Sequence, residues 1–265
     1  KRVRVALRLT SGNQFGMDSE NLKRAVAEKG SYEGVDIVAI HYYSGTQKKK
    51  LAVVEKELAE LEKLADTLEE RFGLSGISLE YGPGLPADYF GDDPEGRDMA
   101  VLAEAGAMIA AVAARRSVTV EFGRFLASPC GTYLTAAADI KNNNGENFVI
   151  CDGGINHLKY YGQTMAMQTP PITLLGDHGE KTEDYTLCGS LCTTADILVR
   201  KVTLPALSVG DVLAFGRCGA YSVTEGIGLF LSRQLPRIVL HSERGGNRLL
   251  RDFYGTDILN SPAEV

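Results

Sequence analysis

The sequence predicts an α/β domain followed by an all-β domain, and two observations support this fold class. In the first half, strand and helix patterns alternate as β-α-β-α-β-α-β, which is typical of a parallel sheet with right-handed crossovers, open or closed into a barrel. After about residue 126, short β segments separated by turns such as NNNGEN and ERGGN predict a mostly antiparallel domain. We therefore assign residues 1–126 to the α/β part and 127–265 to the β domain.

The strands of the first half are indicated by their apolar patterns. Apolar residues alternate from Val3 to Leu9, whereas VDIVAIHYY is rich in β-branched and apolar residues, as buried parallel strands are. Strands are expected at residues 2–9, 35–43, 77–81 and 117–122.

Helices are expected between these strands. Asp18 and Ser19 offer caps to a helix that Gly30 ends. A leucine-rich stripe over residues 47–72 predicts a helix packed on a sheet, and a coiled coil is disfavoured because the stripe covers under four heptads. Asp93-Pro94 starts a third, Ala-rich helix.

The second half contains a series of short segments with strand character. These segments are residues 131–141, 147–154, 171–176, 197–205, 211–216, 238–243 and 247–253. Gly, Asn, Asp and Ser between them are turn formers, so hairpins and short connections are expected.

Composition narrows the classes of function. The formal net charge of −6 argues against a nucleic acid or an anionic membrane as partner, and no apolar run reaches membrane-spanning length. The five cysteines are odd in number and widely spaced, which favours reduced thiols and a cytoplasmic location over a disulfide scaffold.

Cys188 and Cys192, in CGSLCTTADIL, raise a separate question. A zinc site would need a second Cys or His pair of matching spacing, which the sequence lacks, so no metal is expected. A disulfide is disfavoured in a reducing compartment. From the residues alone, both cysteines are most simply small packing residues.

Polar residues and glycines follow the predicted strands, where the site forms in this class of fold. They include Thr46, Gly82, Gly84, Gly123 and Arg124. Glycines let backbone N–H groups approach an anion and an arginine adds a charge, so the set indicates a phosphate site, although a simple turn explains each glycine. Glu121 lies at the same rim, where a solvated or Arg-paired glutamate is the simpler interpretation from spacing alone.

Eight short motifs occur in order along nearly the whole chain. They are QFGMD (14–18), IHYYSGTQ (40–47), YGPGLPADYF (81–90), EFGRFL (121–126), CDGGIN (151–156), GSLCTTAD (189–196), VGD (209–211) and GAY (219–221). Their order resembles the PLP-dependent decarboxylases of the alanine-racemase fold, which include diaminopimelate, ornithine and arginine decarboxylases. The resemblance implies the second half of a PLP-binding (β/α)8 barrel followed by the C-terminal β-sheet domain of such an enzyme.

The resemblance also implies a pyridoxal 5′-phosphate site. Glu121 matches the glutamate that pairs with the pyridine nitrogen, which keeps the ring able to take up the electrons that departing CO2 leaves. Tyr43 stands where relatives stack a histidine on the ring, and Pro83 replaces the middle glycine of their Gly-rich loop. The implied cofactor-binding residues are Tyr43, Thr46, Gly82, Gly84, Glu121, Gly123, Arg124 and Tyr221.

Cys192 matches the cysteine that protonates the carbanion after decarboxylation, a role that suits a thiol with an ordinary pKa of about 8.5. In the family this cysteine reaches the site of the neighbouring subunit, so a homodimer with shared sites is implied. Thr193 replaces an acidic residue that binds the distal amino group of the substrate, which resembles a branch acting on carrier-protein-linked aminoacyl groups; diaminopimelate is the other candidate. Lys159 is a candidate contact to a substrate carboxylate, or is simply solvated.

One expected residue is missing from the chain. Relatives carry a Schiff-base lysine on the first barrel strand, and no lysine here occupies a matching motif. Four of the barrel's eight strands are counted, and half a barrel is expected to expose an apolar edge and inner face. Together with Lys1 in place of Met, this predicts a fragment that is inactive alone or is completed by a second polypeptide. A same-fold racemase and a non-catalytic homologue that regulates a partner enzyme are the alternatives.

Overall fold

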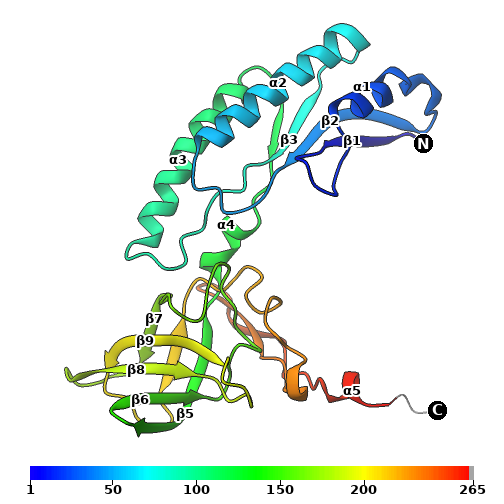
Figure 1. The fold of residues 1–265 in the computed structure, drawn as a ribbon. Helices are drawn as coiled ribbons and strands as arrows, with labels where there is room; N and C mark the ends of the chain where they lie inside the picture. Colours follow the sequence, from blue (N-terminus) through cyan, green and yellow to red (C-terminus); the bar gives the residue numbers. More distant parts are fainter. Residues whose placement is uncertain (263–265) are drawn as a thin grey trace. The chain divides into compact units, whose positions relative to one another are not determined.

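The computed structural model describes residues 1–262 and forms two compact units. The first unit contains residues 1–88 and 93–126, and the second contains residues 89–92 and the chain from residue 127 onward. The parallel α/β sheet and the β domain predicted from the sequence are both present (Figure 1).

The first unit is built on a parallel sheet of four strands in the order β1-β2-β3-β4. The strands are β1 Val3–Leu9, β2 Val35–Tyr43, β3 Ser78–Gly82 and β4 Val118–Val120. β4 is shorter than predicted because only residues 118–120 pair with β3. Since all four strands run in one direction, their carboxyl ends meet at the same edge of the sheet.

Three helices pack on one face of this sheet: α1 Ser19–Ala27, α2 Ala52–Phe72 and α3 Pro94–Ala113. Figure 1 shows α2 and α3 running side by side. α2 starts later than predicted because Gln47 has a left-handed φ of 58° and the Lys48 N–H donates to Gly84 O at 3.0 Å, which removes both residues from the helical ladder. Gly73 ends the helix in the left-handed conformation, as glycine does at this position.

The leucine stripe of α2 forms the centre of the core. Leu58, Leu61 and Leu68 are almost fully buried against Ile40 and Leu79 of the sheet. Each such side chain stabilises the fold by about 1.5–3 kcal/mol relative to an exposed position.

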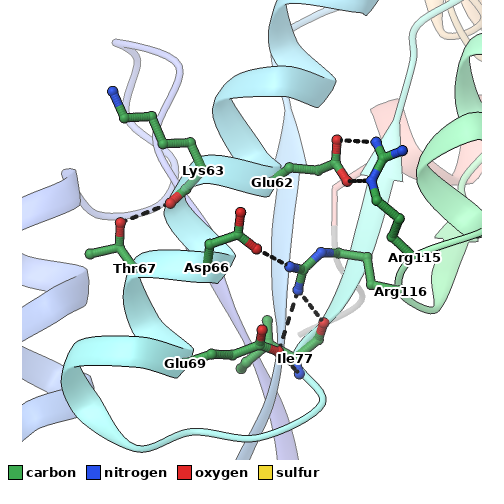
Figure 2. Close-up of polar contacts among 8 residues, drawn as sticks. All are labelled: Glu62, Lys63, Asp66, Thr67, Glu69, Ile77, Arg115 and Arg116. Atoms are coloured by element: carbon green, nitrogen blue, oxygen red, sulfur yellow. Dashed lines mark hydrogen bonds and ion pairs between the residues drawn. The ribbon is translucent and has the colours of Figure 1, made fainter.

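Charged side chains join the end of α3 to α2 (Figure 2). Arg115 donates Nε and an Nη to the two oxygens of Glu62 at 2.8 and 2.6 Å, and this contact raises the pKa of the guanidinium. Arg116 donates to Asp66 and to the carbonyl oxygen of Ile77. Because the Arg115 side chain is exposed, this ion pair contributes little to stability.

The other face of the sheet is polar, and the prediction of an apolar inner face was wrong. Arg8, His41, Glu80 and Thr119 are neighbours in one row across the four strands. Their apolar neighbours along each strand point to the helices, because strand side chains alternate between the two faces. This polar row suits a surface that binds a charged ligand.

The second unit contains a sheet of six strands in the order β7-β10-β5-β6-β8-β9. The strands are β5 Tyr133–Asn143, β6 Glu146–Cys151, β7 Ile172–Leu175, β8 Thr182–Cys188, β9 Ile197–Pro205 and β10 Val212–Phe215. All pairs are antiparallel except β6 with β8. β8 is absent from the sequence prediction, because its first residues, Thr182, Glu183 and Asp184, are polar and mostly exposed.

Short elements complete the chain. A hairpin of β11 Ile238–Ser242 and β12 Gly246–Arg251 is exposed along almost its whole length. The remaining helical elements are η1 Lys29–Ser31, α4 Arg124–Ala127, η2 Ser128–Cys130, η3 Phe230–Ser232 and α5 Asp257–Asn260. No helix among residues 1–262 is long and apolar enough to cross a membrane.

Candidate active site

The loops that follow β2 and β3 approach each other closely through glycine. Gly84 has a φ of +61°, and a Cβ atom at this position would lie 1.9 Å from the carbonyl oxygen of Gly45. At Gly82, a Cβ would lie 2.7 Å from Cδ2 of Tyr43, so the tyrosine ring packs on the glycine. A Cβ atom would clash at both positions, and the backbone conformation of Gly84 is also one that favours glycine.

Hydrogen bonds hold these two loops together. The amide of Gln47 donates to Ala87 O at 3.1 Å and accepts from Ala87 N at 2.6 Å, and Lys48 N donates to Gly84 O at 3.0 Å. Within residues 1–262, no protein acceptor receives the backbone N–H groups of Thr46 and Gly84. The paired loops thus form a rigid cradle with N–H groups available to an anion.

A buried carboxylate anchors the cradle from the helix side. Glu57 of α2 accepts hydrogen bonds from Ser44 Oγ at 2.5 Å, Lys48 Nζ at 2.7 Å and Tyr81 Oη at 2.6 Å. Burial, followed by the contact with Glu57, raises the pKa of Tyr81. This cluster was not predicted from the sequence, because the partners of Glu57 come from two other elements, the loop after β2 and strand β3.

Glu121 lies directly after β4, at the same edge of the sheet. Its Oε2 lies 3.1 Å from Nε2 of His41 on β2, and its side chain is 46% exposed. The carboxylate is therefore open to a ligand while His41 orients it. His41 and Arg8 were not among the predicted site residues, and the signal that could have found them is the alternation that puts them on the inner face.

Gly123 and Arg124 follow one turn later. Gly123 is exposed and Arg124, the first residue of α4, is buried. Thr46 is half-buried in the loop after β2. Thus all the predicted cofactor residues of the first unit lie at or just beyond the carboxyl ends of β2, β3 and β4.

These residues fit pyridoxal phosphate. A glycine cradle with N–H groups that lack protein acceptors is suited to a phosphate. An exposed carboxylate at the neighbouring strand end is suited to a protonated ring nitrogen, and the Tyr43 ring offers an apolar surface. The donor set therefore agrees with the cofactor that the motifs imply.

In the second unit, the residues of CGSLCTTADIL form the connection between β8 and β9. Cys188 is the half-buried last residue of β8, and Cys192 is exposed in the loop. All five cysteines are free thiols. Within residues 1–262, no group of three His, Cys, Asp or Glu side chains is placed to hold a metal ion.

The buried carboxylate of Asp196 holds this loop in place. Its Oδ1 accepts from Ile155 N at 2.9 Å and its Oδ2 accepts from Leu191 N at 2.8 Å. A Cβ atom on Gly154 or Gly189 would lie 2.4 or 2.2 Å from a carboxylate oxygen, so both positions need glycine. Asp196 thereby fastens the Cys192 loop to the CDGGIN loop.

A second polar network lies beneath the CDGGIN loop. Asp152 Oδ1 accepts from Thr135 Oγ1 at 2.5 Å and from Ala136 N at 3.0 Å. His157 bridges the Tyr133 hydroxyl, at 3.1 Å, and the carbonyl oxygen of Gln234, at 2.7 Å. Burial lowers the pKa of His157 and raises that of Tyr133, so this bridge holds a neutral imidazole.

The remaining predicted residues occupy different settings in this unit. Thr193 is half-buried, and its Oγ1 accepts from Ala195 N at 3.2 Å, which caps the turn after Cys192. The Lys159 side chain is exposed. Tyr221 is 52% exposed and has a left-handed φ of 62°, a strained conformation that non-glycine residues keep mainly where their surroundings enforce it.

Comparison with known proteins identifies the family of the chain. Residues 41–219 match the family described as pyridoxal-dependent decarboxylase, C-terminal sheet domain. The chain belongs to this family of decarboxylases.

Two curated relatives illustrate the range of substrates. L-glutamyl-[BtrI acyl-carrier protein] decarboxylase of Niallia circulans is 28% identical over 249 residues, which cover 90% of this chain and 58% of that protein. Diaminopimelate decarboxylase of Archaeoglobus fulgidus is 28% identical over 212 residues, covering 79% and 50% respectively. The chain thus spans about half the length of the curated relatives it matches.

Solved structures confirm the fold. Diaminopimelate decarboxylase from M. jannaschii, in complex with L-lysine, superposes with a TM-score of 0.78 at 24% identity, covering 96% of this chain and 62% of that one. The Helicobacter pylori enzyme, also complexed with L-lysine, gives 0.79 at 18% identity, covering 97% and 66%. The predicted barrel-plus-sheet architecture is confirmed.

Proposed function

We propose that this chain contributes part of a PLP-dependent decarboxylase that acts on an α-amino acid. The observation that carries the proposal is the glycine cradle between Gly45 and Gly84, with Glu121 at a neighbouring strand end. This arrangement offers an anion site and a carboxylate at one edge of a parallel sheet. The family match supports the same reaction class.

Several residues would hold the cofactor. The Thr46 and Gly84 N–H groups and Arg124 would bind the phosphate, Tyr43 would pack on the ring, and Glu121 would pair with the ring nitrogen. Gly82, Gly123 and Tyr221 complete the proposed set. When bound, pyridoxal phosphate supplies the electron sink that makes loss of CO2 from Cα feasible.

Cys192 is the proposed acid. Its thiol is exposed on a loop that Asp196 fixes, so a proton on Sγ is held at a defined place rather than on a mobile chain. The thiol delivers this proton to Cα after CO2 has left. In the proposed homodimer, Cys192 serves the site of the partner subunit.

A carrier-linked aminoacyl group is the proposed substrate. Thr193 carries no negative charge that could bind a distal ammonium group of a substrate, and its hydroxyl already accepts a hydrogen bond from Ala195 N. Lys159, which is exposed in the same unit, could bind an anionic group of the substrate. The Niallia circulans relative, named for a carrier-protein substrate, supports this choice over diaminopimelate. The Schiff-base lysine and the other half of the barrel are proposed to lie outside these 265 residues, in the same or a second polypeptide.

The test follows CO2 and deuterium together in the intact protein with added pyridoxal phosphate. The substrates are α-deuterated glutamate, free and attached to a carrier-protein arm, and α-deuterated diaminopimelate. Release of CO2 from the tethered substrate is expected. Deuterium exchange without CO2 would show a racemase, and neither reaction, with no visible absorbance on adding the cofactor, would show a non-catalytic homologue.

The role of Cys192 is tested by Cys192→Ala, with Cys188→Ala as its matched control four residues away. Cofactor binding and CO2 release persist in Cys192→Ala, but correct protonation slows and product is diverted. Cys188→Ala retains the product of the wild type. Unchanged product from Cys192→Ala would remove the thiol from the mechanism.

A further inference from the structure

A pocket of about 370 Å³ lies within the second unit, and none of the proposed cofactor residues lines it. Its walls include the buried side chains of Leu158, Tyr160, Leu198 and Phe215. The volume lies at the lower end of the range for small-molecule sites, which suits one section of an extended ligand.

The pocket adjoins the loop that carries Cys192. Ala195 and Ile197, which line it, follow Cys192 by three and five residues along the chain. Ile155, another lining residue, donates its N–H to Asp196, the carboxylate that fixes the Cys192 loop. A molecule in the pocket is therefore bound by the same loops that position the proposed acid.

Two exposed cations belong to the lining. Lys159 and Arg200 both line the pocket, and no carboxylate does. Neither side chain forms an ion pair within the described part of the chain, residues 1–262; the Arg200 Nε instead donates to Met165 O at 2.8 Å. The charge of the pocket is thus complementary to an anion beside an apolar chain.

A strained loop forms one side of the pocket. In this methionine loop, residues 163–168, Met165 and Ala166 have φ values of +50° and +57°. The side-chain amide of Gln163 closes the loop by donating to Gln168 O at 2.6 Å and accepting from Gln168 N at 3.1 Å. The backbone N–H of Arg200 donates to Ala166 O at 3.0 Å. Left-handed backbone at non-glycine residues costs free energy and is concentrated at ligand clamps and active sites.

We propose that this pocket holds the phosphate-terminated pantetheine arm on which a carrier protein presents its aminoacyl group. The apolar walls take the uncharged chain of the arm, and Lys159 and Arg200 take its phosphate. This inference rests on the carrier-linked substrate of the proposed function. A free diaminopimelate fits worse: its carboxylates could meet the two cations, but its two ammonium groups would find no carboxylate among mostly apolar walls.

The experiment is calorimetric titration of the intact protein with three probes: 4′-phosphopantetheine, pantetheine and inorganic phosphate. No catalysis is needed, so the result is independent of CO2 release. We expect 4′-phosphopantetheine to bind about tenfold more tightly than pantetheine, since its phosphate gains charge-assisted hydrogen bonds. Inorganic phosphate, which cannot use the apolar walls, binds more weakly than either.

Variants locate the binding. Lys159→Ala abolishes most of the advantage of the phosphorylated probe and Lys159→Arg restores it. Lys201→Ala is the matched control, because Lys201 neighbours Arg200 but pairs with Asp184 at 2.9 Å and does not line the pocket. Ala195→Trp fills the pocket and weakens both organic probes, and thermal unfolding verifies that this variant is folded.

Several outcomes would overturn the assignment. They are equal affinity for pantetheine and its phosphate, phosphate binding as tight as that of the full probe, undiminished binding in Lys159→Ala or Ala195→Trp, or no binding at all. Each of these leaves the decarboxylase proposal standing if CO2 is released. Conversely, probe binding without CO2 release supports the pocket and removes the proposed reaction.

Discussion

The two units place their candidate residues by different means. In the first unit, parallel strands bring Tyr43, Gly82 and Glu121 to one edge because of their common direction. In the second unit, Cys192 lies on an irregular loop that is held by Asp196 and by the Ser190 hydroxyl, which donates to Asp152 O at 3.3 Å. Strand direction thus places the first group, whereas side-chain contacts within loops place Cys192.

In each of the two units, a buried carboxylate anchors a loop. Glu57 in the first unit and Asp196 in the second are buried carboxylates that each accept hydrogen bonds from two segments. Glu57 ties the loop after β2 to strand β3. Asp196 ties the loop after β8, on which Cys192 lies, to the loop after β6, and β6 and β8 are themselves paired in parallel. Mutations in the two units should therefore differ in what they damage.

The largest effect is expected from Glu121→Ala. Loss of the carboxylate that supports the ring nitrogen should reduce the decarboxylation rate of the intact protein by about two to three orders of magnitude, while the fold is retained. Steady-state CO2 release and circular dichroism measure the two quantities. Glu104→Ala, at an exposed glutamate of α3, is the control and should change the rate far less. Similar losses in both variants would contradict a specific role for Glu121.

Gly84→Ala tests the close approach of the two loops that form the cradle. Its new Cβ would meet Gly45 O at 1.9 Å, so the loops must separate, at a cost of about 2–4 kcal/mol in unfolding free energy and with weaker cofactor binding. Gly76→Ala is the matched control, since Gly76 has a similar φ of +65° but open space around it; it should cost about 1–2 kcal/mol. For both variants, urea unfolding measures the stability and titration with pyridoxal phosphate measures cofactor binding. Equal behaviour of the two variants would mean that the close approach is unimportant.

Asp196→Ala tests the loop anchor of the second unit. The buried N–H of Leu191 and the half-buried N–H of Ile155 lose their acceptor, which should destabilise the protein by about 2–4 kcal/mol and free the Cys192 loop. The alkylation rate of Cys192 should rise. It is measured at that residue by peptide mass spectrometry, because Cys130 is also exposed, whereas Cys151 is buried and its pKa is raised to about 12. Asp184→Ala, at an exposed carboxylate, serves as control. A normal Cys192 alkylation rate in Asp196→Ala would show that the loop holds itself.

The smallest effect concerns pH. Burial lowers the pKa of His157 below its ordinary value of 6.5, so the unfolded chain binds the proton more readily. The contribution of His157 is therefore complete above pH 6.5 and declines as the pH falls from there toward its folded value. His157→Gln should flatten this part of the stability curve, measured by urea midpoints above and below pH 6.5, whereas His241→Gln on the exposed hairpin should not. If the stability of His157→Gln still fell with pH as steeply as that of the wild type, other groups would be responsible for the pH dependence.

Local patterns predicted most of the fold, and the errors have physical causes. β8 was missed because its polar first half, Glu183 and Asp184, is stabilised by cross-strand partners such as Thr203 and Lys201 that local alternation does not reveal. The start of α2 was placed too early because the tertiary bond from Lys48 to Gly84 overrides helix propensity. The inner face was expected to be apolar, yet its row of Arg8, His41, Glu80 and Thr119 is polar.

The sequence by itself determined the alternation of strands and helices, the carboxyl-end positions of Gly82, Gly84 and Glu121, and the order of motifs that defines the family. These are local properties, because periodicity and short spacings are carried by neighbouring residues. Only the tertiary structure decided that Glu57 and Asp196 are anchors and that Lys159 and Arg200 share an apolar pocket. Burial of a charge depends on partners supplied from distant segments, and no local pattern specifies which segments those are.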